Sequence, residues 1–76
     1  MRQVVINVEP VELYKILKFE GLVGSGGEAK AVIENGQVRV NSAVETRKRK
    51  KIVAGDIVEY GKETLAIVLQ GKGEAG

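Results

Sequence analysis

Apolar side chains recur along the chain with two different periods, and each period predicts a different kind of element. Over residues 11–20 the apolar positions Leu13, Ile16 and Leu17 follow the spacing of one helix face. Pro10 comes just before them, and its fixed φ and missing amide hydrogen suit the first turn of a helix. The pattern therefore predicts a first helix over this stretch.

The next segment carries a start signal and a stop signal for a second helix. The hydroxyl of Ser25 can accept a hydrogen bond from the helix N-terminus, and Glu28 three residues later completes a capping box. Asn35 and Gly36 both tolerate positive φ, so the helix is expected to end there. Its one apolar stripe consists of Ala29, Val32 and Ile33.

Segments with a period of two predict the strands. Residues 37–41 alternate polar and apolar side chains, and residues 2–8 do so over a longer stretch. Shorter strands are expected at residues 43–46 and 57–60, and an aliphatic last strand at residues 64–70. The first and last strands are the longest, so we expect them to pair and to close the sheet from its two ends.

These elements together predict an α+β fold, with two short helices packed on a small antiparallel sheet. Asn41 and Ser42 predict a tight turn between two of its strands, although serine is a poorer turn residue than glycine. We expect one shared core, made of Leu13, Leu17, Val32, Ile33, Val38 and Val40.

Length and composition narrow the class of protein. The 76 residues suffice for one domain, which we place at residues 1–70, and residues 71–76 offer nothing to bury and predict a flexible tail. The absence of cysteine and histidine argues against disulfides and the usual soft-ligand metal sites, and no cofactor is expected. No apolar stretch approaches ~18 residues, so neither a membrane span nor a signal peptide is expected. We expect a cytoplasmic monomer.

The distribution of charge says more than the net charge of +2, because five of the twelve basic residues are consecutive. They are Arg47, Lys48, Arg49, Lys50 and Lys51. Such a cluster is typical of a surface that neutralises phosphates, and this interpretation is favoured over a merely solvated loop. On a strand the five side chains would point alternately to two faces, whereas an irregular arm would let more of them reach one partner.

Catalysis finds little support in the sequence. The carboxylates are scattered, and no histidine, cysteine or paired acid offers a general base near a nucleophile. The Gly24–Gly27 stretch lacks the Gly-Lys-Ser/Thr ending of a phosphate-binding loop. The bare amides of Gly26 and Gly27 could still hold a phosphate at the helix N-terminus, but Glu28 would repel it, and a tight helix-to-helix turn explains the glycines equally well.

The order of these motifs resembles the S4 RNA-binding domain. The resemblance runs from about Val11 to Tyr60 and rests on Gly-Leu-Val, Ser-x-x-Glu-Ala-Lys, Val-Ile-x-x-Gly-x-Val-x-Val-Asn and a later Ala-Gly-Asp-Ile-Val. The form of the Ser25 motif is similar to that of small stand-alone bacterial S4-like proteins. The resemblance implies an αL-type fold that binds structured RNA on its helical and hairpin face.

Two positions depart from the family pattern. S4 domains usually carry an arginine where this chain has Glu12, and another where it has Gly26. Positive charge reappears elsewhere, so the binding surface is expected to lie closer to the hairpin or to be weaker. The candidate RNA-binding residues are Lys18, Ser25, Gly26, Gly27, Lys30, Arg39, Arg47, Lys48, Arg49, Lys50 and Lys51.

The sequence is compatible with two functions. The first is binding of structured RNA, either ribosomal or transfer RNA, through phosphate contacts, with the ribosome or a subunit as a possible partner. The small number of aromatic residues (one Phe and two Tyr) favours readout of phosphates and shape over stacking on unpaired bases. The second is a protein-interaction module that keeps the fold without strong RNA binding and offers an open sheet edge.

Overall fold

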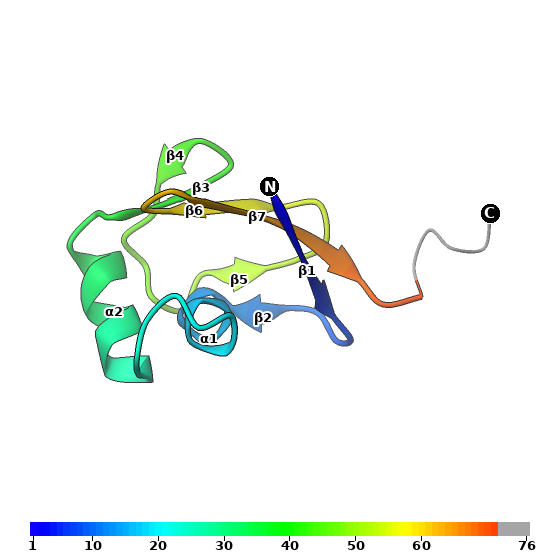
Figure 1. Cartoon of the computed structure of the whole chain (residues 1–76), viewed down its shortest axis with the longest axis horizontal. Helices are drawn as coiled ribbons and strands as arrows, with labels where there is room; N and C mark the ends of the chain where they lie inside the picture. Colours follow the sequence, from blue (N-terminus) through cyan, green and yellow to red (C-terminus); the bar gives the residue numbers. More distant parts are fainter. Residues whose placement is uncertain (72–76) are drawn as a thin grey trace.

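The computed structural model describes residues 1–71, so all of the expected tail except Gly71 lies outside the described residues. The elements follow in the order β1 (Arg2–Ile6), β2 (Val11–Glu12), α1 (Leu13–Phe19), α2 (Gly26–Glu34), β3 (Val38–Val40), β4 (Ala43–Val44), β5 (Lys51–Ile52), β6 (Ile57–Tyr60) and β7 (Glu63–Leu69). Both helices lie on the same side of the main sheet, with the short β2–β5 ribbon beside α1 (Figure 1). The α+β class is confirmed.

Five strands form the main sheet in the order β1-β7-β6-β3-β4. The expected pairing of the first and last strands is confirmed, with Val4 opposite Ile67. This pair is parallel while the other pairs are antiparallel, so the sheet is mixed rather than purely antiparallel. Parallel neighbours need a long crossover connection, and here the chain between β1 and β7 supplies it.

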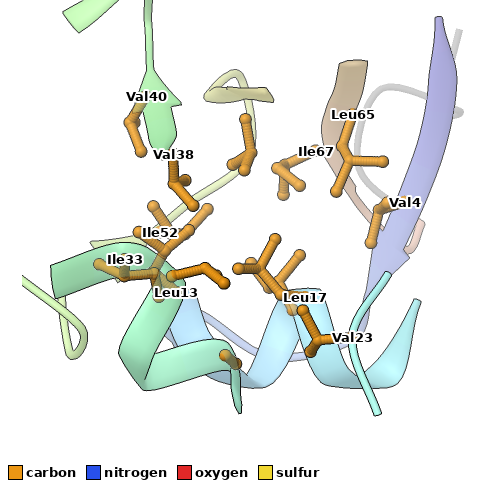
Figure 2. Close-up of a cluster of buried hydrophobic side chains, with 14 of the residues drawn as sticks. Val4, Leu13, Leu17, Val23, Ile33, Val38, Val40, Ile52, Leu65 and Ile67 are labelled. Atoms are coloured by element: carbon orange, nitrogen blue, oxygen red, sulfur yellow. The ribbon is translucent and has the colours of Figure 1, made fainter. Parts of the chain in front are cut away.

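The side chains between the helices and the sheet form one continuous core. All six residues expected there are buried in it, and Figure 2 shows side chains from both helices facing those of the strands. Ile52 lies near Leu13 and Ile33, which brings β5 into the same core. The buried members are Val4, Ile6, Leu13, Ile16, Leu17, Val23, Ala29, Val32, Ile33, Val38, Val40, Ile52, Val58, Leu65 and Ile67.

The first helix begins later than its apolar spacing predicts. Val11 and Glu12 are extended and pair with Ile52 and Lys51, so Pro10 does not lie in a helical turn. The helix starts at Leu13. The prediction was wrong here because a partner strand about forty residues away in sequence takes up the backbone groups of β2, and helical spacing contains no information about that partner.

The second helix begins as its capping signal predicts. The amide of Glu28 donates to Oγ of Ser25 at 3.1 Å, so the N-cap is confirmed. The Glu28 carboxylate reaches back and accepts a hydrogen bond from the amide of Gly24 at 2.7 Å. This amide lies one residue before the cap, so the capping box is shifted by one residue from its usual form. Gly36 follows the helix with φ of 78°, as its stop signal requires.

The β3–β4 hairpin turns on Asn41 and Ser42, as expected. Both residues have positive φ, 52° and 72°, which is the conformation of a type I′ turn. Asn41 is stabilised in this position because its Oδ1 accepts a hydrogen bond from the amide of Ile57 at 2.9 Å. The hairpin is therefore held against the turn that precedes β6.

Candidate nucleic-acid interface

The basic loop, residues 47–51, forms a turn that is attached to the start of α1. The amide of Lys50 donates to the carbonyl of Arg47, and the carbonyls of Lys48 and Lys50 accept hydrogen bonds from the amides of Tyr14 and Leu13, at 3.1 and 2.9 Å. The first amides of a helix have no carbonyl acceptor within the helix, and here two carbonyls of the basic loop accept hydrogen bonds from two of these amides. The loop is thus a fixed part of the helical face rather than a free arm.

Most of the basic side chains in this loop surround one depression. A shallow hollow of about 350 Å³ is lined by Arg47, Arg49, Lys50 and Lys51. Only Lys51 of these lies in a strand, so the alternation of strand side chains does not separate the four residues. An irregular segment of this kind lets most of the basic side chains reach the same binding partner.

Carboxylates form ion pairs with three of the five loop cations, Arg47, Lys48 and Arg49. Arg47 forms a two-pronged hydrogen bond with Glu45 at 2.9 and 3.3 Å, and Lys48 Nζ lies 2.7 Å from Oε2 of Glu34. The hydrogen bond from Arg47 holds the pKa of Glu45 below its usual value. Among residues 1–71, no carboxylate lies within ion-pair distance of Lys50 or Lys51.

A second group of cations converges on the ring of Tyr14. Nζ of Lys30 lies 4.7 Å from the ring centroid, Cζ of Arg49 lies 5.6 Å from it, and Nζ of Lys15 lies 6.0 Å from it. The three side chains come from α2, the basic loop and α1, so the fold gathers them from separate parts of the sequence. Arg49 belongs both to this cluster and to the hollow, which makes the two features one surface.

Glu12 is the acidic member of the same surface. Its two carboxylate oxygens lie 3.6 Å from Lys15 Nζ and 3.6 Å from Arg49 Nη1. Glu12 is therefore a carboxylate that binds two of the surface cations. Lys30 has no carboxylate within ion-pair distance among the described residues, so the cluster keeps an excess of positive charge.

The start of α2 borders this surface but is occupied by its own side chains. Ser25 Oγ and the Glu28 carboxylate take part in capping, so a phosphate approaching these amides would meet a negative charge. A Cβ placed on Gly26 would lie 3.8 Å from the Tyr14 ring and 4.0 Å from Cδ of Lys18, so both side chains flank this first turn. A Cβ placed on Gly27 would lie near nothing except Ser25 Oγ at 3.9 Å.

Arg39 lies apart from the other candidates. Val38 and Val40 on either side of it point into the core, so the Arg39 side chain points to the opposite face of the sheet. Its cross-strand neighbours there are Glu59 and Val44. The structure thus brings together Lys18, Lys30, the Gly26 turn and the basic loop, but not Arg39.

The sequence does not indicate that Tyr14 lies at the centre of a group of cations. It lies off the apolar stripe of the first helix, a position that fits a side chain covering a neighbouring element. The available signal was its spacing to Lys18, four residues on along one helix face. The proximity of Lys30 and Arg49 depends on tertiary structure and leaves no trace in the local sequence.

Other kinds of site find no support in the described residues. Within residues 1–71 no group of three acidic, histidine or cysteine side chains could hold a metal ion. Neither α1 nor α2, the helices of this described part, has the length and apolar character needed to cross a membrane.

A separate groove of about 700 Å³ runs between β1 and α1, and Phe19, which lines it, is 68% exposed.

Comparison with known proteins identifies the family. A family model described as the S4 domain matches residues 4–68. The chain belongs to the S4 domain family. YbcJ of Escherichia coli K12, whose name describes it as a candidate RNA-binding protein, is 52% identical over 58 residues, which cover 76% of this chain and 83% of YbcJ. The solution structure of YbcJ, described as revealing an αL motif involved in RNA binding, superposes with a TM-score of 0.69. That superposition covers 90% of this chain and 87% of YbcJ at 45% identity, and confirms the αL-type fold.

Two further relatives match this chain over different shares of their own length. A protein of Bacillus subtilis strain 168, named as a probable ribosome maturation protein, RlbA, is 35% identical over 71% of this chain and 76% of its own length. The tyrosine–tRNA ligase of Bordetella pertussis is 38% identical over 90% of this chain but only 17% of the ligase. The match to the ligase therefore concerns a small part of that enzyme.

Proposed function

We propose that this S4 domain protein binds folded RNA through phosphate contacts and carries out no catalysis. The observation that carries the proposal is the convergence of cations from α1, α2 and the basic loop on one face, around Tyr14 and the adjoining hollow. Cations clustered in this way neutralise phosphates and release condensed counterions. The described involvement of the related αL motif in RNA binding supports the same function.

Ribosomal or transfer RNA is the proposed class of target. A probable ribosome maturation protein and a tyrosine–tRNA ligase are among the relatives, and their names refer to the ribosome and to transfer RNA. Exposed aromatic side chains that could stack on successive unpaired bases are few, and Phe19 lies on the β1–α1 groove rather than beside the hollow. A phosphate-binding surface of this kind reads the shape of a duplex-containing RNA.

The experiment is a salt titration of the affinity for a blunt RNA duplex. The test variant combines Lys50→Gln with Lys51→Gln, which removes two cations that line the hollow and have no carboxylate within ion-pair distance among residues 1–71. We expect weaker binding and a log-affinity against log-salt slope reduced by roughly 0.7–0.9 for each lost phosphate contact.

The matched control removes the same charge elsewhere. Arg39→Gln with Lys62→Gln changes one residue on the outer sheet face and one in the β6–β7 turn, and neither lines the hollow nor surrounds Tyr14. This control is expected to keep most of the wild-type slope. Equal losses in both variants would mean that net charge alone drives binding, and no binding by the wild type at low salt would contradict the RNA-binding proposal.

A separate feature supports the protein-interaction alternative. β1 is an edge strand of the main sheet, and the groove between it and α1 is lined by apolar side chains such as Val8 and Phe19. An open strand edge beside an apolar groove fits an extended peptide that adds a further strand. Under this alternative, amide signals of residues 2–8 would shift on binding an extended peptide, while the wild type would not bind RNA.

A further inference from the structure

Tyr14 occupies an unusual electrostatic position among the residues of the proposed RNA surface. Three cations on three different elements lie within 6.0 Å of one ring centroid. Like charges repel, and long exposed side chains such as Lys15 would otherwise spread into solvent. The negative face of an aromatic ring attracts a cation, and each exposed contact changes an equilibrium by about two- to five-fold.

The ring has a fixed position, whereas the cations around it are on flexible chains. Tyr14 is half-buried and packs against the core, and its amide is held by the carbonyl of Lys48. The first turn of α2 closes the other boundary, because a Cβ on Gly26 would already be in van der Waals contact with the ring. The ring therefore provides a rigid point at which Lys30 and Arg49 are gathered.

The charges of this cluster do not cancel. Glu12 lies near Lys15 and Arg49, but Lys30 lies near no carboxylate among residues 1–71. Lys15, Lys30 and Arg49 against the single carboxylate of Glu12 leave two positive charges in excess. Two neighbouring phosphates of a sugar–phosphate backbone would neutralise that excess.

We propose that Tyr14 is a positioning residue for a phosphate site, in which its ring holds Lys30 and Arg49 close together so that they bind adjacent backbone phosphates. This inference rests on the proposed function and specifies its ligand chemistry. The ring acts on the cations and not on a base. A base stacked on the ring would have to displace the cations that already contact it.

The first measurement needs no ligand. In the wild-type protein, proton NMR should show the side-chain methylene signals of Lys30 displaced upfield by the ring current of Tyr14. The displacement should persist in Tyr14→Phe, which keeps the ring, and disappear in Tyr14→Leu, which keeps an apolar side chain. A wild-type Lys30 without this displacement would overturn the inference, even if Tyr14→Leu failed to fold.

The second measurement compares binding to a blunt RNA duplex and to inorganic polyphosphate, which has no bases. Tyr14→Leu should weaken the affinity for both ligands by about five-fold or more, because Lys30 and Arg49 lose the ring contact that positions them. The salt slope should stay near its wild-type value, because Lys30 and Arg49 remain and still contact phosphates in the weaker complex. Tyr14→Phe should bind both ligands within about two-fold of wild type, and thermal melts should show that both variants are folded.

The outcomes separate this inference from the proposed function. Wild-type affinity in Tyr14→Leu would overturn the positioning role while RNA binding stood. Equal losses in Tyr14→Phe and Tyr14→Leu would make the hydroxyl a direct contact, which also overturns it. Polyphosphate binding that depends on the ring, without any binding of the duplex, would support the phosphate site and contradict the RNA-binding function. No wild-type binding to either ligand would overturn both.

Discussion

Nδ2 of Asn41 donates a hydrogen bond to Oδ1 of Asp56 at 3.0 Å and so joins two turns of the chain. The amide of Ile57 donates to Asn41 Oδ1, and the amide of Val53 donates to the second carboxylate oxygen of Asp56. Asparagine is also one of the few residues that adopts positive φ at low cost, and Asn41 has φ of 52°. This side chain thus meets a backbone requirement and a tertiary requirement at once.

Replacement of Asn41 by alanine should therefore destabilise the fold. We expect Asn41→Ala to lower the free energy of unfolding by about 1–3 kcal/mol, because the Ile57 amide and the Asp56 carboxylate lose their partner. Urea melts measure this change. Ser42→Gly is the control, because Ser42 has positive φ and its side chain forms no hydrogen bond with residues 1–71, and it should be neutral or slightly stabilising. A melt of Asn41→Ala that matches the wild type would contradict the structural role.

Core truncations test the packing between helices and sheet. Leu17 and Ile33 have 0% exposure, so Leu17→Ala and Ile33→Ala should each cost about 2–5 kcal/mol. Phe19→Ala supplies a matched control on α1, because that side chain is exposed and should change stability by less than about 0.5 kcal/mol. Denaturant melts in which all three variants behave alike would refute this arrangement of the core.

The elements that sequence predicts well are those whose signals are local. Ser25 and Glu28 are three residues apart, and the α2 cap depends on little else. The alternation around Val38 and Val40 likewise decides which face of β3 is buried. The start of α1 is not local, because Val11 pairs with Ile52 in a strand that the sequence did not reveal. The parallel direction of β1 and β7 also depends on how the whole intervening chain folds.

The candidate site also combines features that the local sequence predicts with features that depend on tertiary structure. The run from Arg47 to Lys51 is visible in the sequence, but its form as a turn attached to α1 depends on hydrogen bonds to Leu13 and Tyr14, which the local sequence does not reveal. Lys30 and Tyr14 are sixteen positions apart and become neighbours only through the packing of α1 on α2. Arg39 lies on the outer face of the sheet because both of its neighbours are buried, a consequence that its alternating pattern already contained.

Ser25 should behave as a structural residue. Its Oγ accepts the hydrogen bond from the Glu28 amide, so Ser25→Ala should lower stability by ~1 kcal/mol, while Ser25→Asp should largely preserve it. Thermal melts measure both variants. The affinity for an RNA duplex should stay near the wild-type value in Ser25→Ala at temperatures where the variant is folded. Loss of affinity with an unchanged melt would instead make the hydroxyl a contact to RNA.

The Glu45–Arg47 contact predicts a pH dependence in the acidic range. The hydrogen bond from Arg47 is the main cause that lowers the pKa of Glu45 below 4.5 in the folded protein. A carboxyl with a lowered folded pKa contributes stability above its unfolded pKa and loses it as the pH falls through the folded pKa. Carbon NMR of the Glu45 carboxyl should therefore give a midpoint below 4.5 in wild type and a higher midpoint in Arg47→Gln. Identical midpoints would show that the contact does not persist in solution.

Glu12 should compete with RNA for the cations that it holds. Its carboxylate lies 3.6 Å from both Lys15 and Arg49, so a phosphate must share or replace those contacts. Glu12→Gln keeps the side-chain volume and removes the charge. We expect it to tighten binding of an RNA duplex about two- to five-fold at low salt, the range that exposed ion pairs imply. The gain should shrink as salt rises, because the screening length falls from about 30 Å at 0.01 M to about 8 Å at 0.15 M ionic strength.

The control is Glu63→Gln, which changes the net charge equally at a carboxylate paired with Arg2 and should affect the affinity for RNA little. Equal gains in the two variants would assign the effect to net charge, whereas weaker binding by Glu12→Gln would mean that the carboxylate helps to place Arg49 for the phosphate.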